Sequence, residues 1–141
     1  MPGKHLEAGV RHLPGAAILE LRGEVDGFAE DVLGRAYSAA EETDPSAIIL
    51  NLGDVGYINS KGIALLVVLI MRARQADRRI LAYGLCEHFR EIFRITRLSD
   101  YITLYEDEES ALAGIKRDGQ AAAGTQNREN DGNGTGFQAK A

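Results

Sequence analysis

The stretch 48–71 constrains the fold of this chain more than any other part of the sequence. It opens within a nearly continuous apolar run, Ala47 to Leu52, which predicts a central strand covered on both faces. After a turn that carries Gly and Asp, Asn59 and Ser60 precede a run of nine apolar residues. The length of that run and the helix formers behind it predict a deeply packed helix over 62–76.

Short strand-like and helix-like segments alternate along the rest of the chain. Strands are predicted at 6–13, 16–23, 47–52, 79–84 and 101–105, and helices at 28–42, 62–76, 85–97 and after Asp107, which should cap the last helix. Pro14-Gly15 predicts a hairpin between the first two strands, and strands that alternate with helices require parallel neighbours. We therefore predict an α/β fold with a mixed, mainly parallel sheet, opened by an antiparallel hairpin and accompanied by about four helices.

The first helix shows one apolar stripe, with acidic and basic residues on the opposite face. Its stripe is predicted to face the core and consists of Phe28, Val32, Leu33, Ala36, Tyr37 and Ala40. Asp26, just before it, is a good residue to cap this helix.

Residues 1–117 have the pattern of one folded domain, whereas residues 118–141 do not. The chain has 141 residues, of which 45% are hydrophobic and 26% charged, and these proportions are typical of a globular domain. From Asp118 onward the sequence is rich in Gly, Asn and Ala and almost free of large apolar residues. We therefore predict a disordered polar tail over 118–141.

Composition also limits the classes of function. A net charge of −5 disfavours direct binding of nucleic acid. No apolar run is long enough to span a membrane, and the N-terminus does not resemble a signal peptide. The single cysteine, Cys86, excludes an internal disulfide, and the three histidines lack metal-ligand spacing. We expect a cytoplasmic protein, a monomer when free, with no metal and no cofactor.

Ser60 is the main candidate for chemistry. It stands where the second helix is predicted to begin, among N–H groups that no helical carbonyl can satisfy. A phosphate on its hydroxyl would lie at the positive end of the helix dipole. Asn and Ser are also ordinary capping residues, so a purely structural role is the competing interpretation. Gly62 weakens the first turn for no packing reason visible in the sequence, which favours close approach by a partner or a phosphate.

Three carboxylates, Glu24, Asp26 and Asp54, are predicted at strand ends that face the same rim as Ser60. Asp26 as a cap and Asp54 as a turn residue are the structural alternatives. No histidine is positioned to serve as a base for Ser60, and Lys61 follows the serine, the reverse of a P-loop. We therefore do not expect an enzyme.

These residues resemble the STAS domain family, and within it the bacterial anti-sigma factor antagonists. The resemblance covers about 6–115 and rests on Gly23-Glu24-Val25-Asp26, on Leu50-Asn51-Leu52 with Asp54, and on Ile58-Asn59-Ser60-Lys61-Gly62. There is one departure, because Asn59 stands where the best-known antagonists have Asp.

The resemblance implies a switch between partners. An unphosphorylated antagonist binds a serine kinase that is also an anti-sigma factor; the kinase phosphorylates the antagonist, the complex dissociates, and a metal-dependent serine phosphatase resets the cycle. By position, Ser60 matches the phosphorylated serine and Asp26 the acidic residue near it. The expected partner surface comprises Glu24, Asp26, Asp54, Asn59, Ser60, Lys61 and Gly62.

Two other functions stay open. The chain could be a STAS scaffold in a signalling assembly without a sigma factor. The presence of Asn59 in place of Asp is compatible with this alternative. It could also be a nucleotide-binding signalling module that uses the glycine-bearing rim around Gly53, Gly56 and Gly62.

Overall fold

The computed structural model describes residues 5–124. Its strands are β1 (Glu7–Leu13), β2 (Ala16–Val25), β3 (Ala47–Ile58), β4 (Arg79–Tyr83) and β5 (Thr103–Tyr105). Its helices are the 3-10 turn η1 (Gly27–Ala29), α1 (Glu30–Glu41), α2 (Ser60–Gln75), α3 (Glu87–Ile95), the 3-10 turn η2 (Leu98–Asp100) and α4 (Glu108–Gly124). The part of the chain up to Ala111 forms one compact unit, and the continuation of α4 from Leu112 forms a second.

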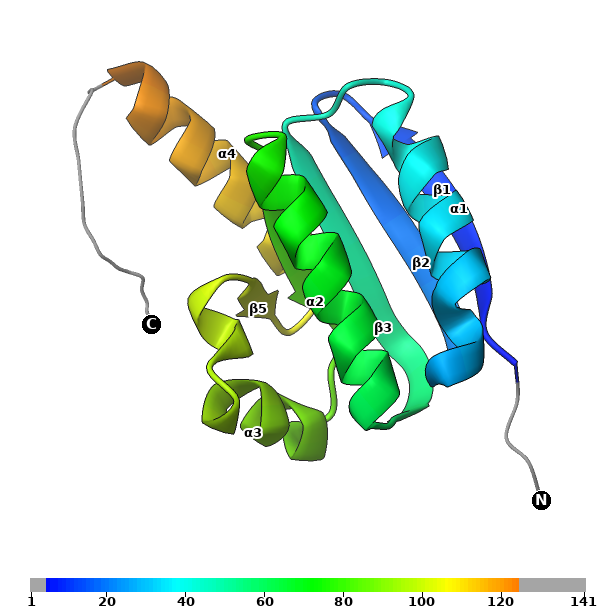
Figure 1. Cartoon of the computed structure of the whole chain (residues 1–141). Helices are drawn as coiled ribbons and strands as arrows, with labels where there is room; N and C mark the ends of the chain where they lie inside the picture. The colour runs from blue at the N-terminus through cyan, green and yellow to red at the C-terminus, as the bar shows by residue number, and fades with distance from the viewer. Residues whose placement is uncertain (1–4, 125–141) are drawn as a thin grey trace. The chain divides into compact units, whose positions relative to one another are not determined.

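The sheet follows the chain order β1-β2-β3-β4-β5. β1 is antiparallel to β2, and the pairs β2–β3, β3–β4 and β4–β5 are parallel, which confirms the predicted α/β fold. Side chains from α1, α2 and α3 share one core cluster with one face of β2, β3 and β4. All three connecting helices therefore cover the same face of the sheet, as α1 and α2 show most clearly in Figure 1.

The three central strands are apolar because they are buried along their length. Residues 16–19 of β2, 47–50 of β3 and 80–83 of β4 are each four buried residues in a row. Removing one large aliphatic side chain from water contributes about 1.5–3 kcal/mol. This burial fixes the start of β3 and, through it, the place where α2 begins.

β3 is longer than predicted, because residues 53–57, expected as a turn, continue the strand to Ile58. They pair with the second half of β2, through Gly23 opposite Val55 and Val25 opposite Ile58, with two shifts of register on the way. Glycine and aspartate are common in turns, but an irregular strand pair also accommodates them. The expectation failed because composition alone does not distinguish the two.

The first helix confirms most of the predicted stripe and corrects one member of it. Leu33, Ala36, Tyr37 and Ala40 are buried, and Val32 is half-buried, whereas Phe28 is 85% exposed. Phe28 belongs to η1, whose three residues per turn differ from the 3.6 of the helix that follows. The 3-10 turn buries Ala29 and leaves the ring of Phe28 on the surface.

α4 begins at the predicted cap and extends beyond the predicted end of the domain. The carboxylate of Asp107 accepts a hydrogen bond from the N–H of Ser110 at 2.8 Å, so the predicted cap is confirmed. The helix runs to Gly124, beyond residue 117, where we placed the domain boundary. The rest of the predicted tail, 125–141, lies outside the described residues. Within the described part, no helix is long and apolar enough to cross a membrane.

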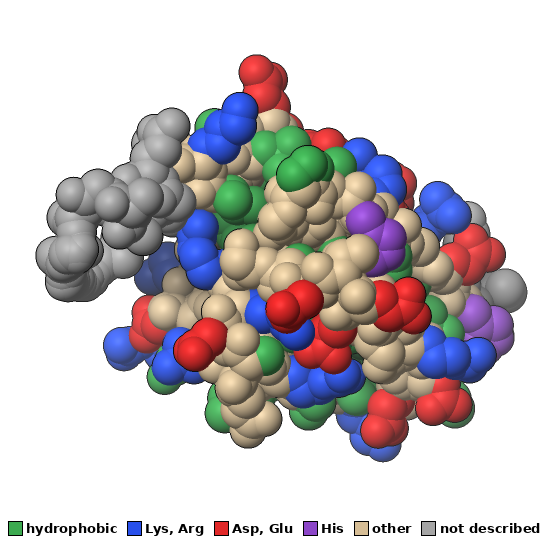
Figure 2. Space-filling model, turned by 90° about the horizontal axis from the view of Figure 1, so that it is seen from above, with side chains coloured by type: hydrophobic (Ala, Val, Ile, Leu, Met, Phe, Trp, Pro, Cys, Tyr) green, Lys and Arg blue, Asp and Glu red, His purple; other side chains and the backbone are tan. Residues whose placement is uncertain are grey.

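The end of the sheet where the parallel strands begin, with residues 41–46 and 72–79, is called the amino rim here. Arg78 donates hydrogen bonds to Asp44 at 3.0 Å and to the Pro45 carbonyl at 2.8 Å, and its side chain is 12% exposed. Arg72 donates to Glu41 at 3.1 Å, and its guanidinium lies 4.4 Å from the centre of a tyrosine ring in α1. Figure 2 looks onto this end, where acidic and basic side chains are intermixed.

Candidate functional site at the start of α2

The opposite end of the sheet, called the carboxyl rim here, comprises residues 24–31 and 57–62. Asn59 caps α2 there, because its side-chain oxygen accepts the N–H of Gly62 at 2.9 Å. Its backbone carbonyl accepts the N–H of Ile63, also at 2.9 Å. Ser60 is the first residue of the helix, and its exposed side chain makes no hydrogen bond within the described part of the chain. The capping role proposed for the serine thus belongs to Asn59.

Gly62 has a packing reason that the sequence did not reveal. A Cβ atom at this position would lie 1.9 Å from the carbonyl oxygen of Val25, at the end of β2. The same oxygen accepts the N–H of Asn59 at 3.2 Å. The expectation that Gly62 lets a partner or a phosphate approach is therefore corrected, because the group that approaches it is internal. This contact fixes the start of α2 against β2.

The loop that follows β2 lies beside the start of α2. Asp26 accepts the N–H of Phe28 at 3.0 Å, so its predicted capping role is confirmed, although the capped element is η1. A Cβ atom on Gly27 would lie 3.0 Å from Cδ of Lys61. The stem of Lys61, the second residue of α2, therefore lies against the first residue of η1. Figure 1 shows the starts of α1 and α2 at the same end of the sheet.

The structure brings Glu24 closer to the serine than Asp54. Glu24 is opposite Tyr57, three residues before Ser60, and the ring of Tyr57 is 48% exposed. Asp54 is opposite Arg22 in the middle of the irregular pair. At about 3.3 Å per residue, Asp54 precedes the end of β3 by about 13 Å. The carboxylates therefore do not form one cluster around the serine.

The carboxyl rim contains no acid–base pair suited to catalysis in the described residues. No hydrogen bond joins Ser60 to a histidine there, and His12 lies 3.3 Å from the hydroxyl of Thr43 instead. The Asp26 carboxylate accepts a backbone N–H. The described residues include no group of three or more potential metal ligands of the His, Cys, Asp and Glu types.

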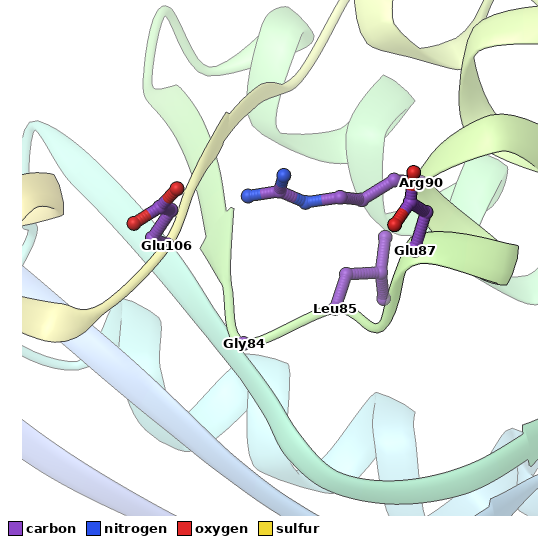
Figure 3. A pocket seen from close by; sticks show the side chains of 5 residues that line it. All are labelled: Gly84, Leu85, Glu87, Arg90 and Glu106. Atoms are coloured by element: carbon purple, nitrogen blue, oxygen red, sulfur yellow. The ribbon is translucent and has the colours of Figure 1, made fainter.

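An open pocket of about 320 Å³ lies where β4 ends, lined by Gly84, Leu85, Glu87, Arg90 and Glu106. In Figure 3 the side chain of Arg90 extends across it, with the two carboxylates at either end. Two carboxylates against one guanidinium leave the pocket negative, which disfavours the phosphates of a nucleotide. The pocket therefore does not support the nucleotide-binding alternative.

A model of the STAS domain family matches residues 7–111. The chain belongs to this family. The resemblance inferred from the residues around Ser60 and Asp26 is thereby confirmed at the level of the family. The match covers the whole sheet and all the elements that position the serine.

Relatives of this STAS domain include anti-sigma factor antagonists. An anti-sigma-B factor antagonist of Listeria monocytogenes is 26% identical over 82 residues, 58% of this chain and 72% of the relative. An anti-sigma factor antagonist from Mycobacterium paratuberculosis has a similar structure, with a TM-score of 0.68 at 20% identity over 79% of this chain and 94% of that one. The phosphorylated form of the Bacillus cell fate determinant SpoIIAA matches with a TM-score of 0.60 at 18% identity, over 77% and 98% of the two chains.

Sequence reasoning missed two aromatic side chains of this STAS domain, Phe28 and Tyr57, which are exposed at the carboxyl rim. Helical spacing placed Phe28 in the core, and Tyr57 fell in an expected turn. One signal was available for Phe28, since residues 24–31 contain four carboxylates and no Lys or Arg. An aromatic residue inside such an acidic segment is more typical of a surface than of a core.

Proposed function

We propose that this STAS domain is an anti-sigma factor antagonist, and that phosphorylation of Ser60 controls its binding to a serine-kinase anti-sigma factor. The observation that carries the proposal is the exposed hydroxyl of Ser60 at the start of a 16-residue helix, with its capping role taken by Asn59. A hydroxyl without a structural task can be modified at little cost to the fold. The names of the relatives support the same function.

The helix start favours the phosphorylated state of the free protein. A phosphoserine carries roughly −1.5 to −2 charges at neutral pH. The N-terminus of an α-helix carries about half a positive charge, and its first N–H groups point outward. Asn59 uses the N–H of Gly62, and the first N–H groups of the helix, from Ser60 and Lys61, remain for the phosphate.

The negative charge of the phosphoserine disfavours the complex with the kinase. In the transfer step the Ser60 oxygen bonds to the γ-phosphorus of ATP, the bond to ADP breaks, and the hydroxyl proton passes to a base of the kinase. The phosphoserine then faces the phosphates of ADP across a desolvated contact. Like charges about 4 Å apart repel by about 1 kcal/mol in water and about 4 kcal/mol at a partly buried site. The partner equilibrium shifts while the domain keeps its fold.

The experiment pairs this protein with each serine-kinase anti-sigma factor of the cells that make it. Intact mass after incubation with ATP should show one phosphate on the wild type and none on Ser60→Ala. By calorimetry, Ser60→Ala should bind like the unmodified wild type, and Ser60→Asp at least tenfold more weakly. Ser99→Asp is the matched control, because Ser99 is also exposed and begins no α-helix. Equal affinities for Ser60→Ala and Ser60→Asp would refute the switch.

A serine phosphatase is the second expected partner, since the switch has to be reset. A purified metal-dependent serine phosphatase from the same cells should remove the phosphate and restore binding. Saturable calorimetric binding of ATP or GTP to the chain alone would instead favour a nucleotide module. Binding to a signalling assembly without a sigma factor, unaffected by Ser60→Asp, would favour a scaffold.

A further inference from the structure

Phe28 is the most exposed large apolar side chain in the described part of the chain, at 85%. Single exposed apolar residues are common on protein surfaces, so the exposure of Phe28 gains meaning only from its surroundings. The backbone of Phe28 is also held in place. Asp26 accepts its backbone N–H at 3.0 Å, and the next residue, Ala29, is buried. The chain therefore presents this aromatic side chain from a capped turn.

The ring stands within a strongly acidic segment. Glu24, Asp26, Glu30 and Asp31 lie within four residues of it along the chain. Glu30 and Asp31 occupy the exposed first turn of α1. No ion pair joins any of these four carboxylates to another of the described residues. The surface around Phe28 is thus apolar at its centre and negative at its edge, where four carboxylates outnumber one cation, Lys61, whose stem lies against Gly27.

We infer that Phe28 is the anchor of the surface by which this protein docks on its kinase partner, in an apolar pocket bordered by Arg and Lys side chains. The inference rests on the proposed function, whose partner it describes. Aromatic anchors at the centre of a contact carry much of the binding energy, and charges at its edge mainly set the rate of association. The negative edge also argues against nucleic acid and against anionic lipid as the occupant.

Phe28 belongs to the same rim as the serine without taking part in its chemistry. The stem of Lys61 lies against Gly27, so the residue that follows Ser60 meets the residue that precedes Phe28 at this rim. In the complex, Ser60 has to face the nucleotide of the kinase, whereas Phe28 faces the apolar pocket proposed on the kinase. Phe28 is therefore a positioning residue for phosphorylation, and its loss should change how well the kinase binds this protein and leave the transfer step unchanged.

The test compares Phe28→Ala with Met71→Ala, using the kinase that phosphorylates Ser60. Met71 is a matched control, since it is 49% exposed and apolar and lies about 16 Å along α2 from Ser60. Kd should rise at least tenfold for Phe28→Ala, mostly through faster dissociation, and less than twofold for Met71→Ala. Phe28→Leu should recover part of the affinity. The thermal midpoint of Phe28→Ala should equal that of the wild type, because the ring is exposed.

Two kinetic measurements separate docking from other roles. For phosphorylation of Phe28→Ala, KM should rise and kcat should stay constant. For the double variant Glu30→Gln, Asp31→Asn, the association rate should fall several-fold at low salt, and this difference should vanish at high salt. A fall in kcat at constant KM would overturn docking.

The outcomes also separate this inference from the proposed function. If Ser60→Asp weakens binding while Phe28→Ala and Met71→Ala bind alike, the Phe28 anchor is wrong and the switch stands. If Phe28→Ala weakens binding while Ser60→Ala and Ser60→Asp bind alike, the anchor stands without the switch. If no serine-kinase anti-sigma factor binds the wild type, both are overturned.

Discussion

The two ends of the sheet use their charged side chains in opposite ways. At the amino rim, Arg72 and Arg78 are paired with Glu41 and Asp44, and the side chain of Arg78 is nearly buried. At the carboxyl rim, the carboxylates of residues 24–31 form no ion pair among the described residues, and an aromatic ring stands in solvent between them. The first arrangement holds the fold together, whereas the second leaves charged groups without an ion pair at the surface that we propose for a partner. Pairing, more than residue type, therefore distinguishes the structural end of the sheet from the end that we propose as functional.

Among the substitutions predicted here, Gly62→Ala is expected to lower the free energy of unfolding most, because Gly62 packs tightly within the carboxyl rim. The Cβ atom introduced by Gly62→Ala would lie 1.9 Å from the Val25 carbonyl oxygen, and neither backbone can yield easily. We expect a loss of at least about 3 kcal/mol in the free energy of unfolding, measured by urea denaturation. Gly34→Ala is the control, because its Cβ meets nothing within 4 Å in the middle of α1, and it should add about 0.5–1 kcal/mol. A neutral Gly62→Ala would show that the start of α2 can move.

The second effect compares the two rims directly. Arg78→Met removes a nearly buried guanidinium that bonds Asp44 and the Pro45 carbonyl, and it should cost about 2 kcal/mol in the free energy of unfolding. The cost stays below that of a fully buried pair because Asp44 is 92% exposed. Glu30→Gln at the carboxyl rim should stay within about 0.5 kcal/mol. The comparison fails if the two variants lose equal stability.

The third effect separates the two residues at the start of α2. Asn59→Ala removes the acceptor of the Gly62 N–H and should cost about 1 kcal/mol in the free energy of unfolding. Ser60→Ala should change this free energy by less than about 0.3 kcal/mol, because the serine hydroxyl bonds to nothing described. Asn59→Asp should keep the cap and match the wild type or exceed it slightly. A larger cost for Ser60→Ala than for Asn59→Ala would return the cap to the serine.

The smallest effect concerns a paired carboxylate on neither rim. The hydrogen bond from Arg11, supported by one from the Tyr83 hydroxyl at 3.0 Å, holds the pKa of Glu108 below its ordinary value. Since this pKa is lower in the folded state, Glu108 adds stability above its unfolded pKa of about 4.3, and the gain is lost as pH falls through the folded pKa. Because its side chain is 35% exposed, the gain should stay below about 1 kcal/mol. Urea midpoints of the wild type and Glu108→Gln should diverge above pH 4 and converge at lower pH.

The sequence predicted the fold because its signals were long or local. The apolar runs of β3 and α2 and the caps at Asp26 and Asp107 needed no knowledge of distant contacts. The reason for Gly62 could not be predicted, since the group it contacts is 37 positions earlier and pairing with β2 creates the contact. Phe28 was misplaced for a different reason. The 3-10 turn η1 changes the direction in which the residues before α1 point. The spacing of apolar residues in the sequence does not reveal that such a turn is present.

Under the proposed function, the exposed side chains of Phe28, Glu30 and Asp31 would allow one fold to serve several signals in the same cell. Phe28, Glu30 and Asp31 are exposed, and neither carboxylate forms an ion pair within the described part of the chain, so these side chains can be exchanged at little cost in stability. Substitutions at Val25, Asn59 and Gly62, by contrast, would disturb the contacts that fix the start of α2. Duplicated copies of this domain can therefore diverge in partner preference by changing a few surface residues while the serine keeps its setting. Cross-talk between such copies would then be limited by the chemistry of a single loop.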